Sequence, residues 1–240
     1  MVHPMRSELE TNDNTQMFET FYQGWLIRQE HYLEALLQMI QCNRDNNTEE
    51  SEVQCKELVD QVLAHYSQYY EARSRVASED VFLVLTPTWF SSFELSHLWI
   101  GGFKPGLAFR LVINNVLDLT EDQSQRMNAL KAEVNEEENE LTNAQQGMEI
   151  VSMVEMVRHV GRVNEVMRDM ESTVERLRVS MEILIEGADF LRRKTVVKVL
   201  DILTASQGIR FLAAAVQLQI KLRRWGMQRD AENQRNNAII

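Results

Sequence analysis

The residues that break helices in this chain are concentrated in one stretch, residues 80–111, and this constrains the fold more than any other feature. The sequence has only 9 Gly and 3 Pro in 240 residues, and the stretch contains Pro87, Pro105 and the glycines at 101, 102 and 106. Pro and Gly interrupt helices, whereas the Leu, Glu, Met, Gln, Ala and Arg that dominate elsewhere favour them. The pattern predicts an all-α fold with short kinked helical segments around residues 80–111.

Long amphipathic helices are expected on both sides of that stretch. Apolar residues recur at spacings of three and four from Phe18 to Ile40 and again from Val53 to Val76, which is typical of helices with one packed face. The polar insert 43–51 separates these two helices and is short, so they are expected to pack as an antiparallel hairpin.

Three further long helices are expected after the stretch. Thr-x-x-Gln pairs at 120/123 and 204/207 have the spacing of a capping box and predict two helix starts. Gly161 marks the expected break before a helix from about Asn164 to Leu203. The last helix is predicted to place Phe211, Leu212, Ala215, Leu218, Leu222 and Trp225 on its packed face.

We expect one domain of roughly seven to nine helices, long ones packed antiparallel. Its predicted bounds are residues 15–227, after an unstructured polar leader over 1–14 and before a flexible tail over 228–240. No apolar run approaches the roughly 18 to 20 residues that cross a bilayer. We therefore expect no membrane segment.

The net charge of −11 disfavours direct binding of nucleic acid. The acidic run at residues 133–140 is interpreted as a solvated helix face without a ligand. The basic end of the last helix, at Lys221, Arg223, Arg224 and Arg229, has two interpretations: a contact with an acidic surface or calmodulin-like partner, or simple compensation of the helix dipole.

Nothing in the sequence predicts catalysis. The five histidines, at 3, 31, 65, 97 and 159, include no pair spaced for a metal, and no nucleophile or phosphate-binding motif is present. Cys42 and Cys55 are too few for a disulfide framework, which favours a reducing compartment. They flank the polar insert, where they are either a redox pair or small buried apolar residues.

Aromatic side chains crowd the central stretch. Trp89, Phe90, Phe93, Trp99 and Phe103 lie within a few turns of one another. Such residues dominate both hydrophobic cores and the energetic centres of protein interfaces. The sequence alone leaves both interpretations open.

The stretch DVFLVLTPTWFSSFELSHLWIGGFKPGLAFRLV resembles the signature of the plant Delay of Germination domain, which is also the C-terminal regulatory domain of TGA-type bZIP transcription factors. FYQGWLIRQEHYLEALL before it and ADFLRRKTVVKVLDILTASQGIRFLAAAVQLQIKLRRW after it fall in the family's order. The resemblance covers about residues 16–227. Only about 15 residues precede it, with Arg6 and no Lys, so the chain resembles the standalone type without a basic region and zipper.

The resemblance implies a regulatory role in seed dormancy and germination through protein contacts, in the nucleus and cytoplasm. Implied partners are type 2C protein phosphatases of abscisic acid signalling, transcriptional co-regulators and bZIP factors, and a second copy of the chain. We place candidate contacts at Phe18, Phe21, Trp25, Phe90, Phe93 and Phe103. The family hallmark residues Trp89, Trp99, Gly101, Gly102 and Pro105 are assigned to architecture.

No cofactor is predicted from the residues, but the family suggests two. Haem binding is associated with the dormancy branch through histidines late in the chain. Here no histidine follows His159, which argues against that route and leaves His159 as its candidate ligand. A fatty acyl chain between helices is the other suggestion. The Met- and Val-rich stripe over residues 148–170 would line such a pocket, or equally a dry core.

Overall fold

Five long helices and three short ones make up the described part of the chain, which contains no β-strand. The computed structural model describes residues 5–42, 48–159 and 166–237. In chain order the helices are α1 (Met5–Cys42), α2 (Glu49–Glu79), α3 (Val81–Leu85), α4 (Ser92–Leu95), α5 (Leu107–Asn115), α6 (Glu121–His159), α7 (Val166–Ile202) and α8 (Ala205–Asn237). The predicted all-α class is confirmed.

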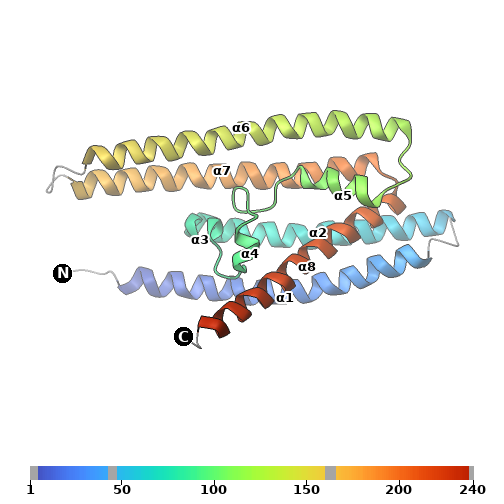
Figure 1. Cartoon of the computed structure of the whole chain (residues 1–240), viewed down its shortest axis with the longest axis horizontal. Helices are drawn as coiled ribbons and strands as arrows, with labels where there is room; N and C mark the ends of the chain where they lie inside the picture. Colours follow the sequence, from blue (N-terminus) through green and yellow to red (C-terminus); the bar gives the residue numbers. More distant parts are fainter. Residues whose placement is uncertain (1–4, 43–47, 160–165, 238–240) are drawn as a thin grey trace.

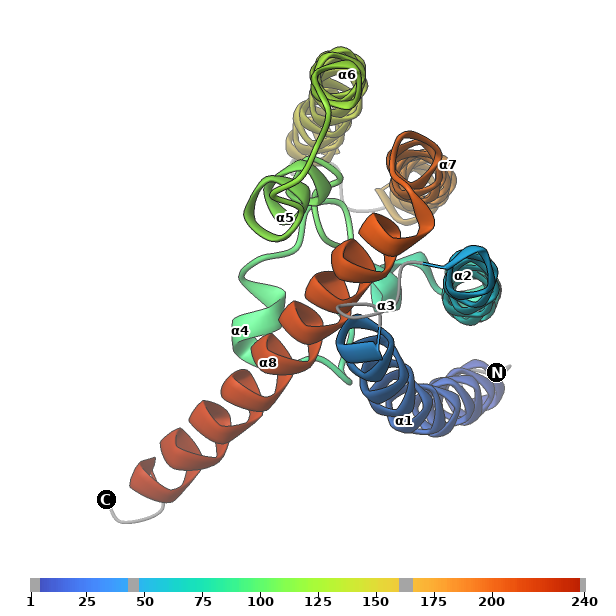
Figure 2. The same cartoon turned by 90° about the vertical axis from the view of Figure 1, so that its right-hand side faces the viewer.

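Two antiparallel hairpins and one crossing helix form the architecture. α1 pairs with α2, as expected, and α6 pairs with α7 (Figure 1). α8 begins beside the end of α7, crosses α2 and α1, and extends beyond them (Figure 2). Of the short helices, α3 packs against α2 and α7, α4 packs against α8, and α5 packs against α8 and α7.

Both predicted capping boxes are present, and they are joined. Thr120 and Gln123 cap α6, with N···O distances of 3.0 and 3.2 Å, and Thr204 and Gln207 cap α8 with the same distances. The two glutamine side chains also bond to each other, because Gln123 Nε2 donates to Gln207 Oε1 at 2.8 Å. The starts of α6 and α8 are therefore fixed against one another.

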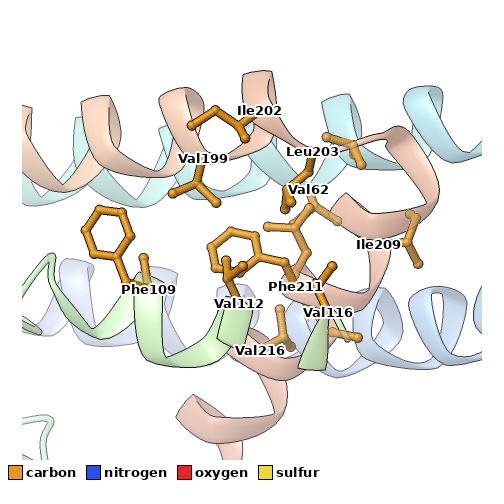
Figure 3. Packing of buried hydrophobic residues seen from close by; sticks show 14 of the residues in the cluster. Val62, Phe109, Val112, Val116, Val199, Ile202, Leu203, Ile209, Phe211 and Val216 are labelled. Atoms are coloured by element: carbon orange, nitrogen blue, oxygen red, sulfur yellow. The ribbon is translucent and has the colours of Figure 1, made fainter. Parts of the chain in front are cut away.

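The hydrophobic core has two parts. The larger lies where α5 and the start of α8 meet α2, α6 and α7, and Figure 3 shows its side chains converging on Phe211. The smaller is aromatic and lies between the N-terminal half of α1, α2, α3 and α7, around Tyr22, Trp25 and Trp89. Cys55 is buried in the larger part and Cys42 is exposed.

The acidic run on α6 is mostly exposed, but part of it contacts α7. Glu133 contacts the ammonium groups of Lys194 and Lys198 at 3.0 and 2.7 Å, and Glu137 contacts Lys194 at 2.6 Å. Glu138 is buried. The expectation of a solvated face is wrong for Glu138, which accepts a hydrogen bond from the Gly106 amide and pairs with Lys104. It agrees with the exposure of Glu133, Glu136 and Glu140.

The ends of the long helices differ from the expectation. α1 begins at Met5, inside the expected leader, and α8 continues to Asn237, inside the expected tail. Neither segment contains Pro or Gly, and polar composition alone does not end a helix. The break expected at Gly161 lies outside the described residues. No helix in the described ranges is long and apolar enough to cross a membrane.

Candidate functional site

Two buried arginines hold the loop that joins α4 to α5. Arg73 on α2 and Arg192 on α7 both contact the carboxylate of Asp189, Arg192 at 2.6 Å. Arg73 also donates to the carbonyl oxygen of Gly101 at 2.9 Å. Burial lowers the pKa of the Arg192 guanidinium, and the neighbouring carboxylate of Asp189 acts in the opposite direction. Each charge therefore has a partner, which buried charges require.

The loop presents its carbonyl oxygens to these arginines. Arg192 donates to the carbonyls of Ile100 and Phe103 at 2.9 and 2.8 Å, and to that of Trp99. Ile100 and Gly101 have φ values of 46° and 67°, in the left-handed region. A Cβ atom at Gly101 would lie 2.5 Å from Arg73 Nη2, so glycine is needed there for both conformation and space.

The predicted hallmark residues surround this network. Trp99 lies under Arg192, 5.4 Å from ring centroid to Cζ, and donates from Nε1 to Thr142 on α6 at 3.0 Å. Gly102 pairs with Trp99 through two backbone hydrogen bonds. Trp89 is buried in the aromatic core and Pro105 is buried beside the loop. Their positions are consistent with the architectural role assigned to them.

A cavity of about 430 Å³ lies behind the loop. Its wall is mainly aromatic and aliphatic, from α2, α5, α7 and α8, and includes Tyr66, Tyr70, Leu111, Val196, Phe211 and Leu218. Burial raises the pKa of Tyr70 to about 12, so its hydroxyl stays neutral. The volume is within the range of small-molecule sites.

Charged groups occupy one part of that wall. Arg73, Asp189 and Arg192 line the cavity together with Lys104 and Arg193. Lys104 and Arg193 are exposed, so the cavity reaches the surface near them. The arrangement can hold an elongated apolar molecule with a polar end. It offers no nucleophile paired with a base.

The structure separates the predicted contact residues into two groups. Phe18 is 4 % exposed and Trp25 is fully buried, so neither presents surface to a partner in this conformation. Phe21 is partly buried beside the aromatic core. The remaining three, Phe90, Phe93 and Phe103, are also partly buried; Phe90 and Phe103 line the cavity, and Phe93 lies against Trp225 of α8.

Sequence reasoning missed Trp225, which was expected on the packed face of the last helix. Its side chain is 46 % exposed and contacts Phe93 of α4, while the neighbouring Arg224 pairs with Glu30 of α1. The helical period places Trp225 correctly in line with Leu218 and Leu222. It cannot show which distant segments pack against that side of α8.

His159 is the last residue of α6, and its side chain lies outside the described residues. Within the described part of the chain, no cluster of three or more His, Cys, Asp or Glu is arranged to hold a metal ion.

The fold and this loop define a class of protein: an all-helical domain organised around one loop of aromatic and glycine residues. The sequence model of the family described as "DOG1: Seed dormancy control" matches residues 32–114, from the middle of α1 to α5. The Arabidopsis thaliana protein RESPONSE TO ABA AND SALT 1 is 35% identical over 90% of this chain and 97% of its own length. Protein DOG1-like 4 of the same plant is 32% identical over 88% of this chain and 93% of its own.

The chain therefore belongs to the seed dormancy control family. Transcription factor TGA3 of Arabidopsis thaliana is 29% identical over 88% of this chain, which spans 54% of that protein. The family and its TGA relatives are regulatory rather than enzymatic, which supports a role for this chain in plant regulation related to dormancy or transcription.

Proposed function

We propose that this protein is a non-enzymatic regulatory module that acts by binding other proteins in transcriptional or abscisic-acid-linked control of seed dormancy and germination. The observation that carries the proposal is the share of each relative's length that this chain covers. The chain covers nearly all of RESPONSE TO ABA AND SALT 1 and about half of TGA3. This coverage supports a regulatory role that a protein of similar length and a longer transcription factor have in common.

Type 2C protein phosphatases and transcriptional co-regulators or bZIP factors are the partners we propose, with action in the nucleus and cytoplasm. A second copy of the chain is a further candidate partner. The partly exposed rings of Phe21, Phe90 and Phe103 are the contact sites retained from the predicted set. Phe18 and Trp25 would support such a surface from below, because they pack in the aromatic core next to Phe21.

Affinity purification from plant nuclei tests the proposal. Tagged full-length protein is compared with Phe21→Ala and Phe103→Ala variants, and with Ile113→Ala, a control at an exposed apolar position on α5. A phosphatase or a transcription factor should be recovered with the wild type and the control. Recovery of neither class with the wild type would sink the proposal.

Direct DNA binding is not part of the proposed function, because the net charge of −11 repels a polyanion. A gel shift should show no complex even at low salt. A complex whose affinity falls steeply with salt would instead indicate phosphate contacts and overturn this point.

The cavity supports a second candidate function, a small-molecule sensor that binds a fatty acyl chain; haem is suggested by the family resemblance alone, since none of the described lining residues is a histidine or cysteine. An acyl chain would lie along the aromatic and aliphatic wall with its polar end near the charged residues. Ala215 lines the cavity, so Ala215→Phe should reduce binding of the fluorescent fatty acid parinaric acid, whereas Ala132→Phe on the exposed face of α6 should not.

Haem is tested by an optical spectrum. A Soret band that saturates at one equivalent of added haem and is lost in His159→Ala would favour the haem sensor. A spectrum without such a band, together with equal parinaric acid binding by both variants above, would remove the sensor function.

A further inference from the structure

The four-residue helix α4 is fixed to the far part of α8 by buried polar contacts. Ser91 and Glu94 form a capping box, in which Glu94 Oε2 accepts from the Ser91 amide at 2.9 Å and from its hydroxyl at 2.7 Å. Glu94 is 4 % exposed and is paired with Arg223 of α8 at 3.5 Å. Arg223 also donates to the carbonyl oxygen of Trp89 at 2.9 Å. An isolated helix of this length is unstable, so these contacts define its position.

Two further contacts bring α4 close to α8. The Ser92 amide donates to Asp230 Oδ2 at 2.9 Å, which places a carboxylate of α8 at the start of α4. Gly226 faces α4 at the crossing, where a Cβ atom would lie 2.8 Å from Ser91 Cβ and 3.2 Å from Phe93 Cβ. The absence of a side chain at Gly226 therefore permits the close approach.

The result is a rigid aromatic and cationic surface at the edge of the molecule. The ring of Phe93 lies 4.2 Å from that of Trp225 at 72°, and 4.3 Å from that of His97. The guanidinium of Arg229 lies 5.2 Å from the centroid of the Trp225 ring. We name Phe93, His97, Trp225 and Arg229 the α4–α8 corner. Three of the four are exposed, and Trp and Arg are the residues most enriched at the energetic centres of interfaces.

The charge of this surface opposes that of the whole protein. Lys221 and Arg229 lie four residues before and after Trp225, on the same face of α8. Neither forms an ion pair with a carboxylate in the described part of the chain. Three carboxylates of this region have other partners: Glu94 pairs with Arg223, Asp230 accepts from the Ser92 amide, and Glu232 accepts from Gln228. On a chain of net charge −11, an exposed tryptophan between two available cations is complementary to an acidic ligand.

We infer that the α4–α8 corner binds an acidic segment of a partner protein that carries an aliphatic or aromatic residue among its carboxylates. The apolar side chain packs on the rings of Phe93 and Trp225, and the carboxylates lie near Lys221 and Arg229. The inference rests on the proposed function, because it names the surface and the partner chemistry that a protein-binding module would use.

Fluorescence anisotropy with a defined probe tests the corner directly. The probe is a fluorescein-labelled peptide with Leu-Phe at its centre and alternating Asp and Glu on both sides, and the control probe has Lys at every acidic position. The full chain should bind the acidic probe and not the basic one. Trp225→Ala should weaken binding about tenfold or more, the effect of losing an interface hot spot, and Trp225→Phe should retain most of it.

Charge-reversed variants measure the electrostatic contribution to peptide binding separately from the contribution of the aromatic rings. Lys221→Glu and Arg229→Glu should each weaken binding and reduce its dependence on salt. Lys131→Glu, at an exposed position of α6, makes the same change of charge and should bind as the wild type does. Phe82→Ala is the matched control for removal of an exposed ring. Circular dichroism melting of every variant confirms that the helices are intact.

Failure of the wild type to bind the acidic probe would overturn the inference. So would an affinity of Trp225→Ala and Arg229→Glu for this probe that equals that of the wild type. Binding of phosphatidylserine vesicles in place of the peptide would also overturn it. Purification from plant nuclei with the Trp225→Ala variant separates the two proposals. If the wild type and the variant recover the same partners in equal amounts, the α4–α8 corner is not the binding surface and the proposed function stands. If the wild type recovers no partner, the proposed function itself is refuted.

Discussion

Arg192 reaches from α7 to the carbonyl oxygen of Phe103, 2.8 Å from its Nε atom, and so ties the central loop to a long helix far away in the sequence. The same guanidinium contacts Asp189 and the carbonyls of Trp99 and Ile100. One side chain thus satisfies three backbone acceptors of a loop that has no strand or helix to pair with. The loop residues keep their positions because of Arg192 and Arg73.

Replacing Arg192 by Met should destabilise the protein by about 3 to 5 kcal/mol, because Asp189 and three carbonyl oxygens lose a buried partner. Arg110→Met, at an exposed position of α5, should change stability by less than about 0.5 kcal/mol. Urea unfolding followed by circular dichroism measures both. Equal midpoints for the two variants would show that the buried arginine does not hold the fold.

Alanine should have opposite effects at two glycines. Gly101→Ala should cost about 1 to 3 kcal/mol, because φ is +67° and the new Cβ would meet Arg73. Gly147 lies within α6 with no heavy atom near the site of its absent Cβ, so Gly147→Ala should stabilise by about 0.5 to 1 kcal/mol. Thermal melting of both variants shows whether each substitution raises or lowers the melting temperature. A change in the same direction at both positions would contradict this prediction.

The parts of the fold that are local in sequence were predictable. Pro87, Pro105 and the clustered glycines indicated where helices are short, and the two Thr-x-x-Gln pairs marked the starts of α6 and α8. The hairpin of α1 and α2 followed from a short polar insert. Each of these depends on residues only a few positions apart, where helix geometry alone decides the contact.

The contacts that organise the candidate site were not predictable in this way. Arg73 and Asp189 are 116 residues apart, and a charged residue within an amphipathic helix normally faces water. Nothing local distinguishes Arg192, which is buried, from Arg193, which is exposed. Trp225 was misplaced for a related reason, since its exposure depends on which distant segments pack against that side of α8.

The joined capping boxes should behave as a coupled pair. Gln123→Ala and Gln207→Ala each remove one of the two hydrogen bonds of a capping box and a buried bond to the other glutamine, so each should cost about 1 to 2 kcal/mol. The double variant should cost about 1 kcal/mol less than the sum, because the shared bond is lost once. Gln125→Ala, on the exposed side of α6, is the control. Strict additivity in urea unfolding would show that the caps act independently.

His65 should make the stability of the protein depend on pH. Its ring is buried, stacked 4.6 Å from that of Trp25, and burial together with Arg28 lowers its pKa from 6.5 to about 4. The unfolded chain therefore binds a proton at this position at a higher pH than the folded chain does. The stabilising effect of a neutral His65 is complete above pH 6.5 and is lost progressively as the pH falls toward 4.

Urea unfolding at a series of pH values between 6.5 and 5 measures this effect before most carboxylates titrate. His65→Phe keeps a flat ring against Trp25 and removes the titrating group, so its free energy of unfolding should fall less over this interval than that of the wild type. His65→Gln serves where the Phe variant folds poorly, and His31→Phe, at an exposed position of α1, controls for loss of a histidine as such. If the His65 variants lose stability as steeply as the wild type, another group carries the pH dependence.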